Sequence, residues 1–183
     1  MKKTIWILTA IVGCVILWGT LTYNSIIREE EQLWQSWSQV ENVYQRRLEL
    51  VPNLVDVVSS YSDYEERTLV NVVTERAKAV STTVITSGTQ NEEQLLRFDE
   101  AQQLLSDAVD DILVSVENYP DLKAIDAYQT FLAQYEGCEN RILIERRRYN
   151  QSVNLYNQKI RKFPNNLIAN IFNFKPQPSG HSL

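Results

Sequence analysis

The stretch LWQSWSQVENVYQRRLELVPNLVDVVSSY, residues 33–61, decides the fold of this chain. Its apolar and aromatic residues recur in alternating steps of four and three, the spacing that lines one face of a helix packed against other helices. Pro52 removes one backbone donor, yet the spacing keeps its phase on both sides of it, so we expect Pro52 to bend a continuous helix rather than end it. This face, the first seam, consists of Leu33, Trp37, Val40, Tyr44, Arg47, Val51, Leu54, Val58 and Tyr61.

Two later segments carry the same spacing. Residues 92–118 form the second seam with Leu95, Phe98, Gln102, Leu105, Val109, Ile112 and Val116. Residues 128–163 form the third seam with Tyr128, Leu132, Tyr135, Glu139, Ile142, Arg146, Tyr149, Val153, Tyr156, Ile160 and Phe163. The pattern is looser over residues 69–80, and residues 81–91 (STTVITSGTQN) are typical of a loop that turns at Gly88.

These patterns predict an all-α protein. Short connections between long helices make neighbours antiparallel, as in an up-and-down bundle. We expect three long helices, or four if the first one splits near residues 59–63. The bundle should occupy residues 24–174.

The N-terminal segment predicts a membrane span. Residues 4–27 (TIWILTAIVGCVILWGTLTYNSII) carry no charge, and the strongly apolar part from Ile5 to Leu21 extends about 25 Å as a helix, close to the ~30 Å hydrocarbon thickness. We therefore expect residues 4–23 to form a transmembrane helix. A cleaved signal peptide is disfavoured because no small-x-small site follows the apolar core. Residues 11–14 (IVGC) resemble a lipoprotein signal, which would lipidate Cys14, but the chain stays apolar beyond them.

Basic residues beside the span predict its orientation. Lys2 and Lys3 precede it, whereas Arg28 alone follows closely, beside three glutamates at residues 29–31. The positive-inside rule then places residues 1–3 in the cytoplasm and the bundle on the other side of the membrane.

The composition argues against several classes of function. The net charge of −5 provides no cationic field for a phosphate backbone, so we expect no nucleic-acid partner. His181 is the one histidine, which excludes serine–histidine and cysteine–histidine catalysis within the chain and most histidine metal sites. The sequence also lacks a glycine-rich phosphate loop, and its two cysteines cannot form a CxxC clamp. We expect no cofactor, no metal site and no catalytic residue.

Three charged residues lie on the seams: Arg47, Glu139 and Arg146. A charge on a seam costs several kcal/mol to desolvate unless it is paired. We therefore hypothesise that Arg47, or its neighbour Arg46, pairs with Glu139 between antiparallel helices. Such a pair can fix the register of a bundle, and a polar binding site between helices is the other interpretation.

The C-terminal region has two parts. Residues 166–174 (NLIANIFNF) contain enough apolar side chains for a short helix that covers one end of the bundle or touches the membrane surface. Residues 175–183 (KPQPSGHSL) have the composition of a disordered tail.

Several motifs along the chain together resemble the LemA family. They are WSQV at 37–40, Arg46-Arg47, LVPNLV at 50–55, YPDLKA at 119–124, ENRI at 139–142, Arg146-Arg147, Tyr149-Asn150, Tyr156-Asn157 and FPNNLIA at 163–169. Ser25 to Ile27 and Gly137-Cys138 depart from the family pattern. The resemblance implies a bacterial membrane protein with one N-terminal span and an antiparallel bundle. It also implies no established catalytic residue, and it links some relatives to membrane remodelling or envelope functions.

From these features we expect a single-pass scaffold or interaction protein of the bacterial inner membrane, without catalytic activity. Its partners would be the lipid bilayer and other envelope proteins, or further copies of itself. The alternatives are an accessory subunit of a membrane enzyme or protease, and a ligand-binding bundle with a polar site between helices.

Overall fold

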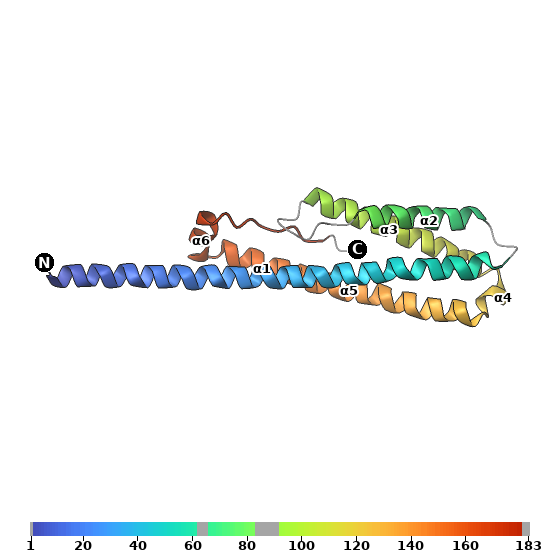
Figure 1. The fold of residues 1–183 in the computed structure, drawn as a ribbon, viewed down its shortest axis with the longest axis horizontal. Coiled ribbons are helices and arrows are strands. Elements are labelled where there is room, and N and C mark those ends of the chain that lie inside the picture. Colours follow the sequence, from blue (N-terminus) through green and yellow to red (C-terminus); the bar gives the residue numbers. More distant parts are fainter. Residues whose placement is uncertain (1, 62–65, 83–91, 181–183) are drawn as a thin grey trace.

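A computed structural model describes residues 2–61, 66–82 and 92–180. The chain order of the helices is α1 (Lys2–Ser59), α2 (Glu66–Ser81), α3 (Glu92–Val116), α4 (Pro120–Lys123), α5 (Asp126–Arg161) and α6 (Asn165–Ile171). Figure 1 shows α1, α2, α3 and α5 running alternately in opposite directions, as expected for an up-and-down bundle. The predicted all-α fold is confirmed.

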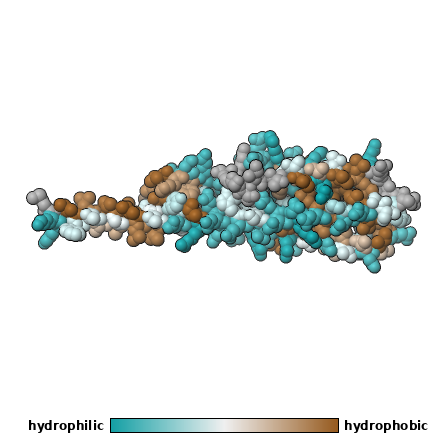
Figure 2. Space-filling model, in the orientation of Figure 1, coloured by the Kyte–Doolittle hydropathy of each residue, from teal (hydrophilic) through white to brown (hydrophobic). Residues whose placement is uncertain are grey.

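The first third of α1 projects beyond the bundle as a single exposed helix (Figure 1). Every side chain from Lys2 to Leu17 is exposed, and Figure 2 shows this segment as largely hydrophobic. Among the described residues, α1 is the one helix long and apolar enough to cross a membrane. An apolar surface of this length is stable in a bilayer and costly in water.

The second half of α1 forms the core of the bundle with α5, α3 and α2. All positions of the first seam are buried except Tyr61, which is half-buried, and the whole second seam is buried. On α5 the third seam is buried apart from half-buried Leu132 and Glu139 and exposed Phe163. Spacing therefore identified the packed faces of α1, α3 and α5, because side chains three and four residues apart share one face. It did not identify that of α2, where the pattern is looser and Val73 and Val80 are exposed.

The bundle contains four long helices among the described residues. α1 ends at Ser59 and α2 begins at Glu66, so the split near residues 59–63 occurs, although residues 62–65 lie outside the described part. The loop expected around Gly88 also falls outside it, except for residues 81 and 82. Pro120 begins α4, and α5 ends at Arg161, shortly before Pro164.

Pro52 lies inside α1 and does not end it. Because proline has no N–H, the carbonyl of Leu48, four residues earlier, cannot receive its usual helical hydrogen bond. Arg76 of α2 donates its Nε–H to that carbonyl at 2.8 Å. A side chain of the neighbouring helix thus satisfies the acceptor that Pro52 leaves.

The short helix α6 packs where the projecting third of α1 meets the bundle. It ends in a Schellman motif, in which the Phe174 amide donates to Ala169 O at 2.9 Å and the Asn173 amide donates to Asn170 O at 3.4 Å. Asn173 has φ 58°, which asparagine tolerates better than most side chains. The turn places Phe174 against Tyr23, with ring centroids 5.7 Å apart.

The prediction of a disordered tail is wrong for residues 175–180. Asn157 of α5 donates its Nδ2 to Gln177 O and accepts the Gln177 amide on Oδ1, both at 2.9 Å. Tyr149 donates its hydroxyl to Pro178 O at 3.0 Å, and Gln177 is buried. This segment therefore lies along α5, and residues 181–183 fall outside the described residues.

Candidate functional site

The two buried arginines of the bundle lie in one polar network between α1, α3 and α5. Arg47 of α1 has only 3% of its side chain exposed, and it donates to Glu139 Oε1 of α5 at 3.0 Å. Its second terminal nitrogen donates to the backbone oxygen and side-chain oxygen of Gln102 on α3, at 2.6 and 2.7 Å. The hypothesised pair between Arg47 and Glu139 is therefore present, and Gln102 accepts from the same guanidinium.

Arg146 of α5 forms the other half of the network. Its guanidinium donates twice to the Asp99 carboxylate of α3, at 2.8 and 3.0 Å, the paired geometry that is strongest for this side chain. It also donates to the hydroxyl of Tyr44 at 2.7 Å. The positive charge predicted on the third seam thus meets a carboxylate, as burial of a charge requires.

Tyr44 connects the two arginines. Its ring lies under the Arg47 guanidinium, 5.1 Å from ring centroid to Cζ, while its hydroxyl accepts from Arg146. Phe98 packs edge-on against the same ring at 5.1 Å. Burial raises the pKa of the Tyr44 hydroxyl, although the arginine charges oppose this shift, so Tyr44 stays protonated at neutral pH.

Two arginines and two carboxylates give this network no formal net charge, which is the arrangement expected of a structural layer. The cavity beside it measures about 70 Å³ and is lined by Tyr44, Arg47, Asp99 and Glu139, among other residues. That volume admits a few water molecules and is far below the roughly 300 Å³ of small ligand sites. The geometry favours the register-fixing interpretation over a ligand site.

Arg46 does not take part in the network. Its side chain is 59% exposed and lies 3.8 Å from Glu49, one turn along the same helix. One residue of displacement along a helix rotates a side chain by about 100°, which carries Arg46 away from the seam that Arg47 occupies.

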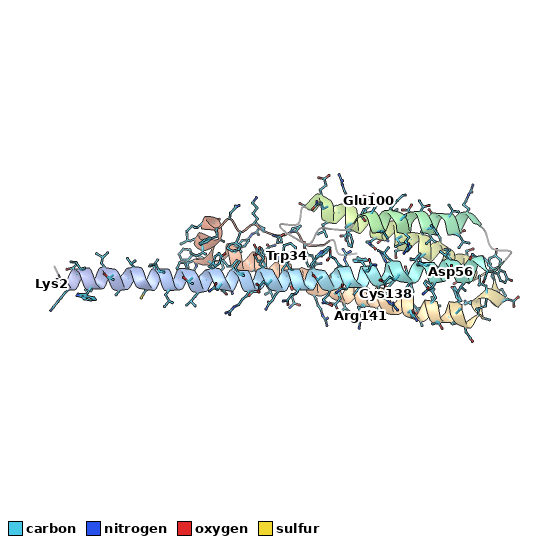
Figure 3. The ribbon with its side chains drawn as sticks, viewed as in Figure 1. Lys2, Trp34, Asp56, Glu100, Cys138 and Arg141 are labelled. Atoms are coloured by element: carbon cyan, nitrogen blue, oxygen red, sulfur yellow. The ribbon has the colours of Figure 1, made fainter. Side chains whose placement is uncertain are left out.

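A larger open groove of about 730 Å³ follows the outer side of α1 and α5. Arg46 lines it together with Arg141 and Cys138, and Figure 3 shows the last two on α5. Cys138 is buried with its thiol 3.4 Å from Val43 O, and burial raises the pKa of that thiol. A protonated thiol is a weak nucleophile, so Cys138 packs the floor of the groove rather than providing reactive sulfur. We call this feature the α1/α5 groove.

Sequence reasoning missed Asp99 and did not recognise the roles of Tyr44 and Gln102. Tyr44 and Gln102 lie on seams, and a polar residue on a seam was the available signal. Asp99 lies next to the second seam and not on it, so periodicity does not mark it. Across the described residues, no three His, Cys, Asp or Glu side chains are grouped as metal ligands.

The fold and this network define a helical bundle carried by an N-terminal helix able to span a membrane. The LemA family profile matches residues 36–180, so the chain belongs to the LemA family. Magnetosome protein MamQ 2 of Paramagnetospirillum magneticum is 26% identical over 171 residues, which covers 85% of this chain and 63% of that protein. Protein LemA of Metamycoplasma hominis is 25% identical over 146 residues, covering 80% and 63% respectively. The chain thus spans less than two thirds of the length of these relatives.

Proposed function

We propose that this protein is a single-pass scaffold of the bacterial inner membrane that presents a rigid bundle to other envelope proteins, without catalysing a reaction. The observation that carries this proposal is the continuity of α1, which contains both the exposed apolar segment and the first seam of the bundle. Its 58 residues extend roughly 87 Å at 1.5 Å per residue. A partner bound to the bundle would therefore be held at a set distance from the bilayer.

The balanced network supports rigidity. Each buried arginine is held by side chains of two other helices, so sliding one helix past another would expose an unpaired charge. A stiff bundle suits a presenting role, because a partner then loses less conformational freedom on binding.

The positive-inside asymmetry around the span supports a cytoplasmic N-terminus and a bundle on the non-cytoplasmic side. A reporter enzyme that is active only in the cytoplasm tests this orientation when fused after residue 183. We expect it to be inactive, and an active fusion would overturn the orientation while leaving the scaffold proposal open to its own test.

Photocrosslinking in intact membranes tests the scaffold proposal. A photoreactive amino acid at Asn42 or Asn140 lies in the exposed lining of the α1/α5 groove, and Glu100 of α3 provides an exposed control outside it (Figure 3). We expect one dominant protein adduct from the two groove positions and none from Glu100. An adduct with a membrane enzyme or protease would favour the accessory-subunit alternative, and the absence of adducts from both groove positions would contradict presentation through this groove.

A further inference from the structure

The helix α6 carries an apolar surface that its packing in the bundle does not bury. Leu167 and Ile171 are four residues apart and share one face of α6, and Ile171 is 72% exposed. Phe163, just before α6, is 74% exposed, and Phe172, just after it, is 56% exposed. The opposite face, with Ile168 and Ala169, is buried against the rest of the protein. α6 thus exposes apolar side chains beside Asn170 as well as burying them, unlike a helix at the end of a bundle whose outer face meets water.

The position of α6 along α1 matches one edge of the membrane span. A methyl group added at Gly19 would lie 3.6 Å from Ile168 Cδ1, and the Tyr23 ring centroid lies 4.7 Å from that of Phe172. Residues 4–23 extend about 30 Å, one hydrocarbon thickness, so Gly19 and Tyr23 belong to its last turns. Figure 1 shows α6 beside α1 at the point where the projecting third ends and the bundle begins.

The exposed surface of α6 is continuous with the surface of the span. Val15 and Ile16 of α1 lie one turn before Gly19 on the side of the helix that carries α6, and they are 58% and 64% exposed, so both helices present apolar side chains to the same surroundings. Exposed Arg161, Lys162 and Lys175 flank α6 in the chain, where they suit lipid phosphates. Cations beside an apolar face are the composition of helices that lie in the membrane interface.

We propose that α6, with Phe163 and Phe172, is a second membrane contact that inserts into the leaflet on the bundle side and binds anionic phospholipid headgroups through its flanking cations. This inference rests on the proposed membrane span of α1. Two contacts, one through the bilayer and one in its surface, restrict the tilt and rotation of the bundle more than a single helix does. α5 connects α6 directly to the network of Arg146, so the second contact is joined to the rigid part of the bundle.

Depth-dependent fluorescence quenching tests the proposal on the full chain. The background variant carries Cys14→Ser and Cys138→Ser, and an environment-sensitive dye is attached at Ile171→Cys. One copy of the protein is placed in each nanodisc of phosphatidylethanolamine and phosphatidylglycerol, with bromine on the acyl chains either near the headgroup or at mid-chain. We expect blue-shifted emission and stronger quenching by the bromine near the headgroup.

Two further dye positions separate the possible failures. Ile11→Cys reports the middle of the span, and Val114→Cys reports an exposed apolar position on α3, 65% exposed. Quenching at Ile11→Cys combined with none at Ile171→Cys would overturn the second contact and leave the span intact. No quenching at either position would overturn the span itself. If the emission of the dye at Ile171→Cys is blue-shifted only when two copies share a nanodisc, this face contacts a second copy. That result would also overturn the proposal.

A charge on the apolar face provides a matched test. Leu167→Glu, with the dye at Ile171→Cys, should reduce quenching to the level of the Val114→Cys control. Leu104→Glu on α3 makes the same change at a similarly exposed leucine, and it should leave quenching unchanged. Equal quenching in both variants would contradict insertion of this face. Replacing phosphatidylglycerol with phosphatidylcholine should weaken quenching, and an unchanged signal would contradict the role of the cations.

Discussion

Arg76 donates its Nε–H to the carbonyl oxygen of Leu48 at 2.8 Å, and Leu48 is the residue whose helical hydrogen bond Pro52 removes. The contact explains how α1 tolerates a proline inside its packed half. The proline creates an acceptor on α1, and the neighbouring helix α2 occupies it. Pro52 therefore contributes to the pairing of α1 with α2, because it leaves a backbone acceptor that Arg76 of α2 can bind.

A double-mutant cycle tests this relationship. Arg76→Met should lower the free energy of unfolding by about 1 kcal/mol, because Leu48 O loses its donor. In a Pro52→Ala background the amide of residue 52 can again donate to Leu48 O, so Arg76→Met should cost less stability. Denaturant unfolding in detergent measures both effects. Arg67→Met, at an exposed arginine of α2, is the control, and its cost should not depend on residue 52. Equal costs for Arg76→Met in the two backgrounds would contradict the assignment.

Removing one charge of the Arg47–Glu139 pair should destabilise the bundle more than replacing both residues with apolar ones. Glu139→Gln leaves the Arg47 charge buried, and we expect a loss of roughly 1–3 kcal/mol, moderated because the Glu139 side chain is 32% exposed. The double variant Arg47→Met and Glu139→Leu should recover part of this loss, since no buried charge remains. Denaturant unfolding of both variants measures the two losses of stability. A double variant less stable than Glu139→Gln would contradict this account.

Tyr44 should contribute through its hydroxyl as well as its ring. Tyr44→Phe keeps the ring beneath Arg47 and removes the acceptor for Arg146, so we expect a loss of about 1 kcal/mol. Asp99→Asn should cost more, roughly 1.5–3 kcal/mol, because it removes a charged partner bonded twice. Arg97→Met, which breaks a pair with Glu93 in which both side chains are exposed, should cost at most about 1 kcal/mol and serves as the comparison in the same unfolding assay.

Asp110 should make stability depend on pH. Partial desolvation of the carboxyl, followed by the nearby charge of Glu139, raises the pKa of Asp110 in the folded protein, although the residue as a whole is exposed. The folded state then holds this proton more tightly than the unfolded state, so the contribution of Asp110 to stability falls as pH rises through the folded pKa. Asp110→Asn should therefore stabilise the protein at neutral pH, and the gain should vanish below the unfolded pKa. Thermal unfolding across pH measures this, with Asp56→Asn, at an exposed acid of α1, as the charge-matched control. A stability gain of Asp110→Asn that persists unchanged at acid pH would exclude the raised pKa of Asp110 as its cause.

Asn157 should hold the C-terminal segment on α5. Asn157→Ala removes both hydrogen bonds to Gln177, so the Gln177 amide should exchange its hydrogen faster while the bundle amides keep their protection. Asn154→Ala, at an exposed position of α5, should leave that exchange unchanged. Hydrogen exchange read by mass spectrometry or NMR makes the comparison. Unaltered exchange at Gln177 in Asn157→Ala would show that other contacts hold the segment.

The sequence alone determined the all-α class, the membrane segment and the packed faces of α1, α3 and α5. An uncharged run at residues 4–27 is sufficient for a membrane helix, and spacing of three and four residues identifies which side of each helix is buried. The sequence also indicated that Glu139 pairs with Arg47 or Arg46, because opposite charges on seams that pack together have few other ways to be satisfied, and the structure selects Arg47.

Only the tertiary structure decided the contacts made by residues away from the seams. Asp99 as the partner of Arg146, and Arg76 as the donor to Leu48, depend on how each helix is rotated and on which helix lies beside it. Periodicity gives the direction of a face but not the neighbour it meets. The extended segment at residues 175–180 has no period at all, and its place on α5 arises from hydrogen bonds to Tyr149 and Asn157. Such contacts exist only once the folded helices bring together residues that lie far apart along the chain.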